Sequence, residues 1–203
     1  MKERPIAFSP EMVRAILDGR KTMTRRVVKP QSDGDGLSKL IDGPWIDTSE
    51  RVFPCPHGVP GDKLWVRETC AFVECDSTPS GIPIDPFVVY FADGASLEAL
   101  RHHGYFVERW TPSRFMPRRA SRILLEIEDI RVERVQEISG QDVQDEGVAD
   151  SLAFGKNNPV SRQNWERAQH RAFARLWNTI HKAKPEHQWD ANPFVWVISF
   201  RRV

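Results

Sequence analysis

Cysteine is scarce in this sequence, which contains only Cys55, Cys70 and Cys75. An odd number of so few cysteines does not form a disulfide framework. The N-terminus lacks the apolar segment of a signal peptide, and no apolar run approaches the length of a membrane span. These absences argue against a disulfide-stapled secreted domain and against a membrane protein. We therefore expect a protein of the reducing cytoplasm with no membrane partner.

Net charge is also nearly absent, because 29 lysines and arginines are balanced by 28 aspartates and glutamates. A polycationic nucleic-acid binder is thereby excluded, and any contact with nucleic acid must come from local clustering of charge. Basic residues do cluster in 14–29 and again in 114–122, whereas acidic residues concentrate in 126–150.

Several familiar chemical motifs are missing. The sequence has no glycine-rich phosphate loop and no Gly-x-Ser-x-Gly elbow. His57, His102 and His103 accompany the cysteines, but no Cys-x2-Cys pair is present and the spacing is not that of a zinc site. We predict no metal and no cofactor, and we interpret the cysteines as buried or incidental.

Three segments carry helix signals. Ser9 followed by Pro10 is a favourable N-cap and first position, and Gly19 suits a C-cap, so a helix is predicted over 9–18. A short helix is predicted from Ser139 to about Gly147. A longer one is predicted over 165–181, with these apolar residues on one face: Trp165, Ala172, Phe173, Leu176, Trp177 and Ile180.

Strands outnumber helices and do not alternate regularly with them. We predict strands at 25–28, 63–68, 87–91, 121–135 and 193–203. In 121–135 the apolar alternation slips by one residue at Glu128-Asp129, which predicts a β-bulge or a tight bend. Residues 29–61 are rich in turn formers and are interpreted as a long irregular excursion. This order favours a mixed, β-barrel-like α+β domain.

The most informative motif is Gly19 to Arg26, which holds one lysine, two threonines and three arginines. A lysine becomes a base or nucleophile only when its pKa is lowered, and neighbouring arginines or burial can lower it. Thr24 would need such a base to attack a carbonyl. A basic turn with solvated charges explains the same residues and stays open as the alternative.

Two other groups of residues have both a functional and a purely structural interpretation. Asp142 and Glu146 are four residues apart and share a helix face, although a solvated acidic helix would look the same. In the run from Arg114 to Arg122, the arginines could hold phosphates while Phe115 stacks on a base. A surface loop leading into a strand is the alternative for this run.

The segment Gly19-Arg20-Lys21-Thr22-Met23-Thr24 resembles the signature of the ASCH domain family, a PUA-like β-barrel group. Three further segments resemble parts of the family in the same order. Residues 60–68 resemble its Gly-Asp turn with a barrel strand, and residues 123–146 resemble its strand with a short acidic helix. Residues 194–203 resemble its closing strand. This chain also resembles the longer ASCH proteins of phages and prophages in the sequence patterns of residues 4–9, 116–118 and 192–197.

This resemblance implies one PUA-like domain over 1–203, with a mixed β-barrel of about five to seven strands flanked by short helices. It also implies one longer C-terminal helix and insertions at about 29–59, 70–119 and 151–190. The insertions could cap the cleft beside the barrel, extend it over a polynucleotide, or block it.

The resemblance further implies binding of RNA or a modified nucleobase in a basic cleft. Small bacterial ASCH members are amidohydrolases that remove the acetyl group from N4-acetylcytidine, and their proposed lysine, threonine and glutamate fall on Lys21, Thr24 and Glu146. Asp145 or Glu137 could replace Glu146 in this set. Thr24 would attack the amide carbonyl, Lys21 would relay its proton, and Glu146 would orient Lys21 or protonate the leaving amine.

The expected partner is therefore RNA, a nucleoside or a nucleotide, bound by a monomer. Five arginines are the candidates for phosphate contacts: Arg20, Arg25, Arg26, Arg114 and Arg118. The alternative function is that of a phage or prophage accessory protein that acts through protein–protein contacts without catalysis. A large exposed apolar patch on the insertions would mark it.

Overall fold

The computed structural model describes residues 1–29, 38–40, 45–74, 86–148 and 162–203. Its strands are β1 (Glu3–Ala7), β2 (Met23–Val27), β3 (Ser38–Lys39), β4 (Trp45–Ile46), β5 (Val52–Phe53), β6 (Lys63–Arg67), β7 (Cys70–Glu74), β8 (Phe87–Tyr90), β9 (Phe106–Val107), β10 (Leu124–Arg134) and β11 (Phe194–Arg202). Its α-helices are α1 (Pro10–Leu17), α2 (Leu97–His102), α3 (Gly140–Asp145) and α4 (Arg162–Ile180).

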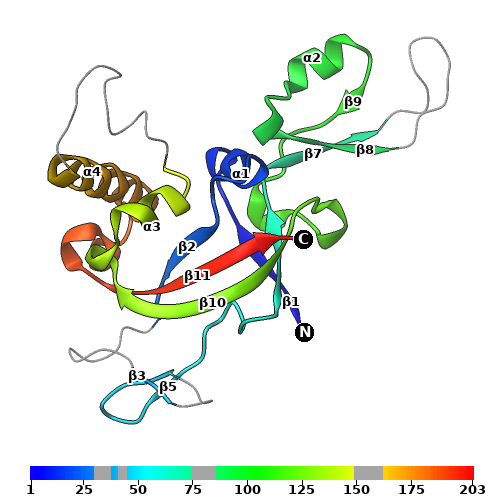
Figure 1. Cartoon of the computed structure of the whole chain (residues 1–203). Coiled ribbons are helices and arrows are strands. Elements are labelled where there is room, and N and C mark those ends of the chain that lie inside the picture. Colours follow the sequence, from blue (N-terminus) through cyan, green and yellow to red (C-terminus); the bar gives the residue numbers. More distant parts are fainter. Residues whose placement is uncertain (30–37, 41–44, 75–85, 149–161) are drawn as a thin grey trace.

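A five-stranded mixed sheet forms the centre of the molecule, in the order β1-β6-β10-β11-β2 (Figure 1). β1 pairs in parallel with β6, and the other pairs are antiparallel. One face of the sheet packs a core that includes Leu64, Trp196 and Phe200. The other face packs against α3 and α4 through a second core that includes Val143 and Trp177. The sheet thus lies between two apolar layers.

The predicted α+β class is confirmed, and the main sheet has a strand number within the predicted five to seven. The pairings run from β1 to β2, and within the described ranges these two edge strands do not pair with each other. The predicted irregularity in β10 is also confirmed, because its register with β11 shifts between Ile127 and Asp129. β1 was not predicted; it contains Pro5, which strands tolerate at a sheet edge.

The helix ends follow from their caps. Ser9 Oγ accepts a hydrogen bond from Met12 N (3.5 Å) at the start of α1, and Gly19 follows the helix with φ +73°. Ser139 Oγ likewise accepts from Asp142 N (3.1 Å) at the start of α3. α4 begins at Arg162, earlier than its apolar face predicted. None of the helices in these ranges is long and apolar enough to span a bilayer.

Two small sheets occupy stretches that the sequence predicts mainly as loops or insertions. They have the orders β3-β4-β5 and β8-β7-β9. Of their strands, only β8 was predicted, and several of the others are two residues long. Figure 1 places the β7–β9 sheet with α2 at one end of the molecule and α3 with α4 at another. Parts of the three predicted insertions, together with Cys75, lie outside the described residues.

Candidate functional site

The Gly19–Arg26 motif lies against the C-terminal end of α3. Lys21 forms an isolated antiparallel bridge with Glu146, and Thr22 N donates to Asp145 O (2.9 Å). Gly147 follows with φ +77°, a conformation that glycine adopts readily and that L-residues rarely adopt. This turn brings the backbone after α3 directly onto the segment that precedes β2.

Lys21 is completely buried and all three of its ammonium hydrogens are used. Its Nζ donates to Glu146 Oε2 (2.7 Å), to Glu146 O (2.8 Å) and to Met23 O (2.7 Å). Burial lowers the pKa of Lys21, and the adjacent Glu146 carboxylate partly offsets that shift. The ammonium group of Lys21 is thus held in place by three hydrogen bonds.

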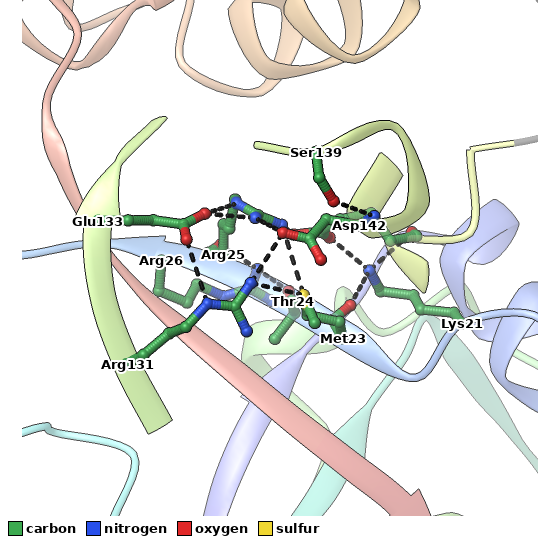
Figure 2. A network of polar contacts seen from close by, with 10 residues as sticks. Lys21, Met23, Thr24, Arg25, Arg26, Arg131, Glu133, Ser139 and Asp142 are labelled. Carbon is green, nitrogen blue, oxygen red and sulfur yellow. Dashed lines mark hydrogen bonds and ion pairs between the residues drawn. The ribbon is translucent and has the colours of Figure 1, made fainter. Parts of the chain in front are cut away.

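Arg25 contacts three carboxylates, and Figure 2 labels two of them, those of Glu133 and Asp142. Its guanidinium donates to Asp142 Oδ2 (2.6 Å) and to Glu146 Oε1 (3.4 Å), and its Nε donates to Glu133 Oε1 (3.1 Å). Arg131 completes the network by donating to Glu133 Oε2 (3.1 Å) and Asp142 Oδ2 (2.8 Å). Burial alone would raise the pKa of Asp142, but the hydrogen bond from Arg25 and the charges of Arg25 and Arg131 hold it below its usual value.

This cluster is balanced in charge, with the cations of Lys21, Arg25 and Arg131 opposite three carboxylates. A buried ion pair costs desolvation energy and tolerates the loss of one partner poorly. The cluster therefore fixes the position of Glu146 relative to β2.

Thr24 and Arg26 project to the other face of β2, because side chains alternate along a strand. Arg26 Nη1 donates to the buried Thr24 hydroxyl (2.7 Å), and Arg26 Nη2 donates to Ala7 O (3.0 Å). Arg26 Nη1 also donates to the Arg25 carbonyl (3.0 Å). A guanidinium has five N–H donors, and three of those of Arg26 are used by described residues, which leaves donors for a ligand in this part of the chain.

A cavity of about 290 Å³ opens between β2, α1 and α4. Its apolar walls are Met12, Phe173, Leu176, Trp177 and Ile180. Its charged lining is Arg25, Arg26 and Glu146, and it is completed by Ala7, Ser9 and His181. Concave, mainly apolar pockets with a few placed polar groups are typical ligand sites, and this volume is at their small end.

The wall formed by α4 is aromatic and uncharged at neutral pH. The rings of Trp177 and His181 lie 4.4 Å apart between centroids. Burial, together with the nearby His187, Arg26 and Lys29, lowers the pKa of His181 to about 4. The imidazole is therefore neutral at pH 7, and a planar ligand would meet a neutral ring.

Among the residues predicted from sequence, the structure brings Lys21 and Glu146 together. Asp145 instead accepts from Gln141 Nε2 (3.1 Å), and Glu137 accepts from Arg134 N (2.8 Å). Of the three acids considered, Glu146 is the one whose side chain contacts Lys21. Thr24 is not among the three acceptors of Lys21 Nζ, and its hydroxyl lies with Arg26.

The five arginines expected at phosphates have different positions. Arg26 lines the cavity with free donors, whereas Arg25 is buried and its guanidinium is held by carboxylates. Arg20 is exposed and pairs with Asp18 (2.9 Å). Arg118 pairs with Glu3 (2.9 Å), and neither it nor Arg114 lines this cavity.

Sequence reasoning missed part of the site. Arg131 and Glu133 were not singled out, although Glu133 faces Arg25 across the sheet. The apolar face predicted for 165–181 did contain Phe173, Trp177 and Ile180, but it gave no sign that they line a cavity. Apart from the family resemblance, the shared helix face of Asp142 and Glu146 was the signal in the sequence that pointed to this network.

No family model and no curated protein matches this sequence. Among solved structures, the chain is similar to a DUF984 protein from Enterococcus faecalis V583, with 10% identity and a TM-score of 0.42 over 100% of this chain and 81% of that one. It is also similar to an ASCH domain from Lactobacillus crispatus JV V101, with 11% identity and a TM-score of 0.37 over 99% of this chain and 79% of that one. Both likenesses have TM-scores below 0.5 and identities near 10%, and they assign neither a family nor an activity to this chain.

Proposed function

We propose that this chain binds RNA or a single nucleobase, with the base held in the cavity between β2, α1 and α4. The observation that carries the proposal is that Glu146 lines a cavity whose walls are apolar and aromatic. A nucleobase matches that combination, since it has two apolar faces and a polar edge.

Glu146 also gives the site a preference among bases. Its two oxygens have more acceptor positions than the bonds from Lys21 and Arg25 occupy, and the bond from Arg25 is long at 3.4 Å. A carboxylate accepts hydrogen bonds from an exocyclic amino group such as N4 of cytosine. Where cytosine has its amino group, uracil has the acceptor O4, which a carboxylate repels. We therefore expect cytidine to bind more tightly than uridine, by about tenfold.

The binding prediction is tested with two neighbouring residues of α4. Ile180 lines the cavity and is 53% exposed, whereas Thr179 is exposed and does not line it. Ile180→Glu is expected to weaken cytidine binding by at least about tenfold, because it places a charge on the apolar wall. Thr179→Glu adds the same charge one residue away and should bind cytidine like the wild type. Isothermal titration calorimetry would measure both, and equal affinities of the two variants would refute the placement.

Hydrolysis of an N4-acylated cytosine nucleoside is a second candidate function. One observation favours it: a buried Lys21, with a lowered pKa, contacts the carboxylate of Glu146, a residue that lines the cavity. In this reaction Thr24 Oγ would bond to the acyl carbon, the C–N bond would break as the amine gains a proton, and water would then release the acid. Thr24 would have to exchange its bond with Arg26 for contact with the substrate.

Ultraviolet absorbance of N4-acetylcytidine would report this turnover. Thr24→Val should abolish it, while Thr24→Ser, which keeps the hydroxyl, should retain a measurable rate. Turnover that is unchanged in Thr24→Val would remove Thr24 from the mechanism. A wild-type protein that binds cytidine but leaves N4-acetylcytidine intact would end the hydrolysis proposal and preserve the binding one.

A further inference from the structure

A second cavity, of about 620 Å³, lies on the small sheet of β8, β7 and β9. One face of that sheet is packed, because Ala71, Val73 and Val107 contact apolar residues that include Leu97 and Leu100 of α2. The opposite face carries Phe72, Val88 and Phe106, all of which line the cavity. A small buried cluster of Cys70, Met116 and Ala120 packs against Phe72 and Val88 and covers part of this face.

One aromatic ring on this face is highly accessible, and a second is partly so. Phe106 is 67% exposed, and Phe72 and Val88 are only half-buried. Next to the cavity, in the 3₁₀ turn Ser113–Phe115, Phe115 is 65% exposed and lies 4.7 Å from the guanidinium of Arg114. Exposed rings of this kind on a sheet are a recurrent platform on which nucleic-acid bases stack.

Two arginines that line this cavity have no ion-pair partner among the described residues. Arg109 and Arg119 line it, and neither forms an ion pair or a side-chain hydrogen bond with another residue in the described part of the chain. The neighbouring Arg122, in contrast, is fully engaged with Glu68 and Asp93. Free guanidiniums beside exposed rings suit a phosphate chain whose bases stack.

The cavity is not uniformly positive, since Glu74 and Glu108 also line it. Charge alone therefore does not make it a site for a free inorganic anion. The combination of rings with free arginines favours a ligand that has both planar bases and spaced phosphates.

We infer that the open face of the β8-β7-β9 sheet binds a single strand of nucleic acid. Its bases stack on Phe106 and Phe72, and its phosphates contact Arg109 and Arg119. This surface is separate from the cavity that contains Glu146, because the two cavities share no lining residue. The inference stands whether or not that first cavity holds a nucleobase.

Fluorescence anisotropy with a labelled oligouridylate of about ten nucleotides tests this inference, with the matching oligodeoxythymidylate as a second arm. Phe106→Ala should weaken binding by roughly tenfold, since loss of a stacking ring costs that order of affinity. The double variant Arg109→Ala/Arg119→Ala should weaken binding and reduce the slope of log K against log salt by about 1.4. All three side chains are exposed, so circular dichroism should show native folding.

The control is Arg171→Ala, which removes an exposed arginine of α4 that lines neither cavity. This variant should bind both oligonucleotides like the wild type. Cytidine affinity should be unchanged in Phe106→Ala, which separates this surface from the first cavity. The inference is overturned if the wild type binds neither oligonucleotide, or if Phe106→Ala and the double arginine variant bind them normally. Loss of oligonucleotide binding in Ile180→Glu alone would also overturn it, by locating the strand at the first cavity.

Discussion

Replacing Lys21 with methionine is expected to reduce the free energy of unfolding by about 3–5 kcal/mol. Methionine fits the stem of the lysine but leaves Glu146 buried with only the long bond from Arg25. Removing one member of a buried ion pair strands the other charge, and that is the source of the loss. Urea denaturation of the wild type and the variant would measure it.

Two further variants make this prediction specific. Lys182 is exposed just beyond α4, so Lys182→Met should change the free energy of unfolding by no more than about 0.5 kcal/mol. In the double variant Lys21→Met/Glu146→Gln, the stranded carboxylate is gone, and the total loss should be smaller than the sum of the single losses. Strictly additive losses would show that Lys21 and Glu146 do not interact as the structure has them.

Gly147→Ala is expected to be nearly as damaging, with a loss of about 2–4 kcal/mol in the free energy of unfolding. The backbone at Gly147 has φ +77°, which disfavours any L side chain. A Cβ there would also lie 2.9 Å from the Cβ atoms of both Ala15 and Lys21. Part of the loss therefore comes from pushing the turn after α3 away from Lys21.

Gly19 offers a matched control for the steric part of this effect. Its φ of +73° is nearly the same, but a Cβ at Gly19 would meet no atom within 4 Å. Gly19→Ala should therefore show only the backbone strain, about 1–2 kcal/mol by thermal or chemical denaturation. If the two substitutions cost the same, the close approach of Gly147 to Ala15 and Lys21 makes no steric contribution to the loss.

Local signals in the sequence were sufficient for parts of the fold. Ser9, Pro10 and Gly19 delimit α1, and the slip in alternation predicts the bulge between Ile127 and Asp129. These features depend on neighbouring residues, so they can be read without a tertiary structure. Strands of two residues such as β4 and β9 have too few positions to show an alternation, and their pairing depends on distant segments.

For a related reason, the sequence predicted some contacts of the site and not others. The family resemblance suggested Lys21 and Glu146 as neighbours, and the structure joins them at 2.7 Å. The motif also suggested Arg25 for phosphates, because arginines in a basic run look alike in sequence. Only the fold shows that Arg25 points toward Glu133 and Asp142, whereas Arg26 projects to the other face of β2. Thr24 projects with Arg26 for the same reason of strand alternation.

The central claim is that the cavity beside Glu146 holds a nucleobase, and a cytidine titration of isotope-labelled protein followed by NMR tests it most directly. The claim predicts that the amide signals that shift with cytidine fall in 7–12, 25–26, 146–147 and 173–181, the segments that contain the lining residues. Uridine should shift the same signals at higher concentration. Shifts confined to other segments, or no shifts at saturating cytidine, would contradict the claim.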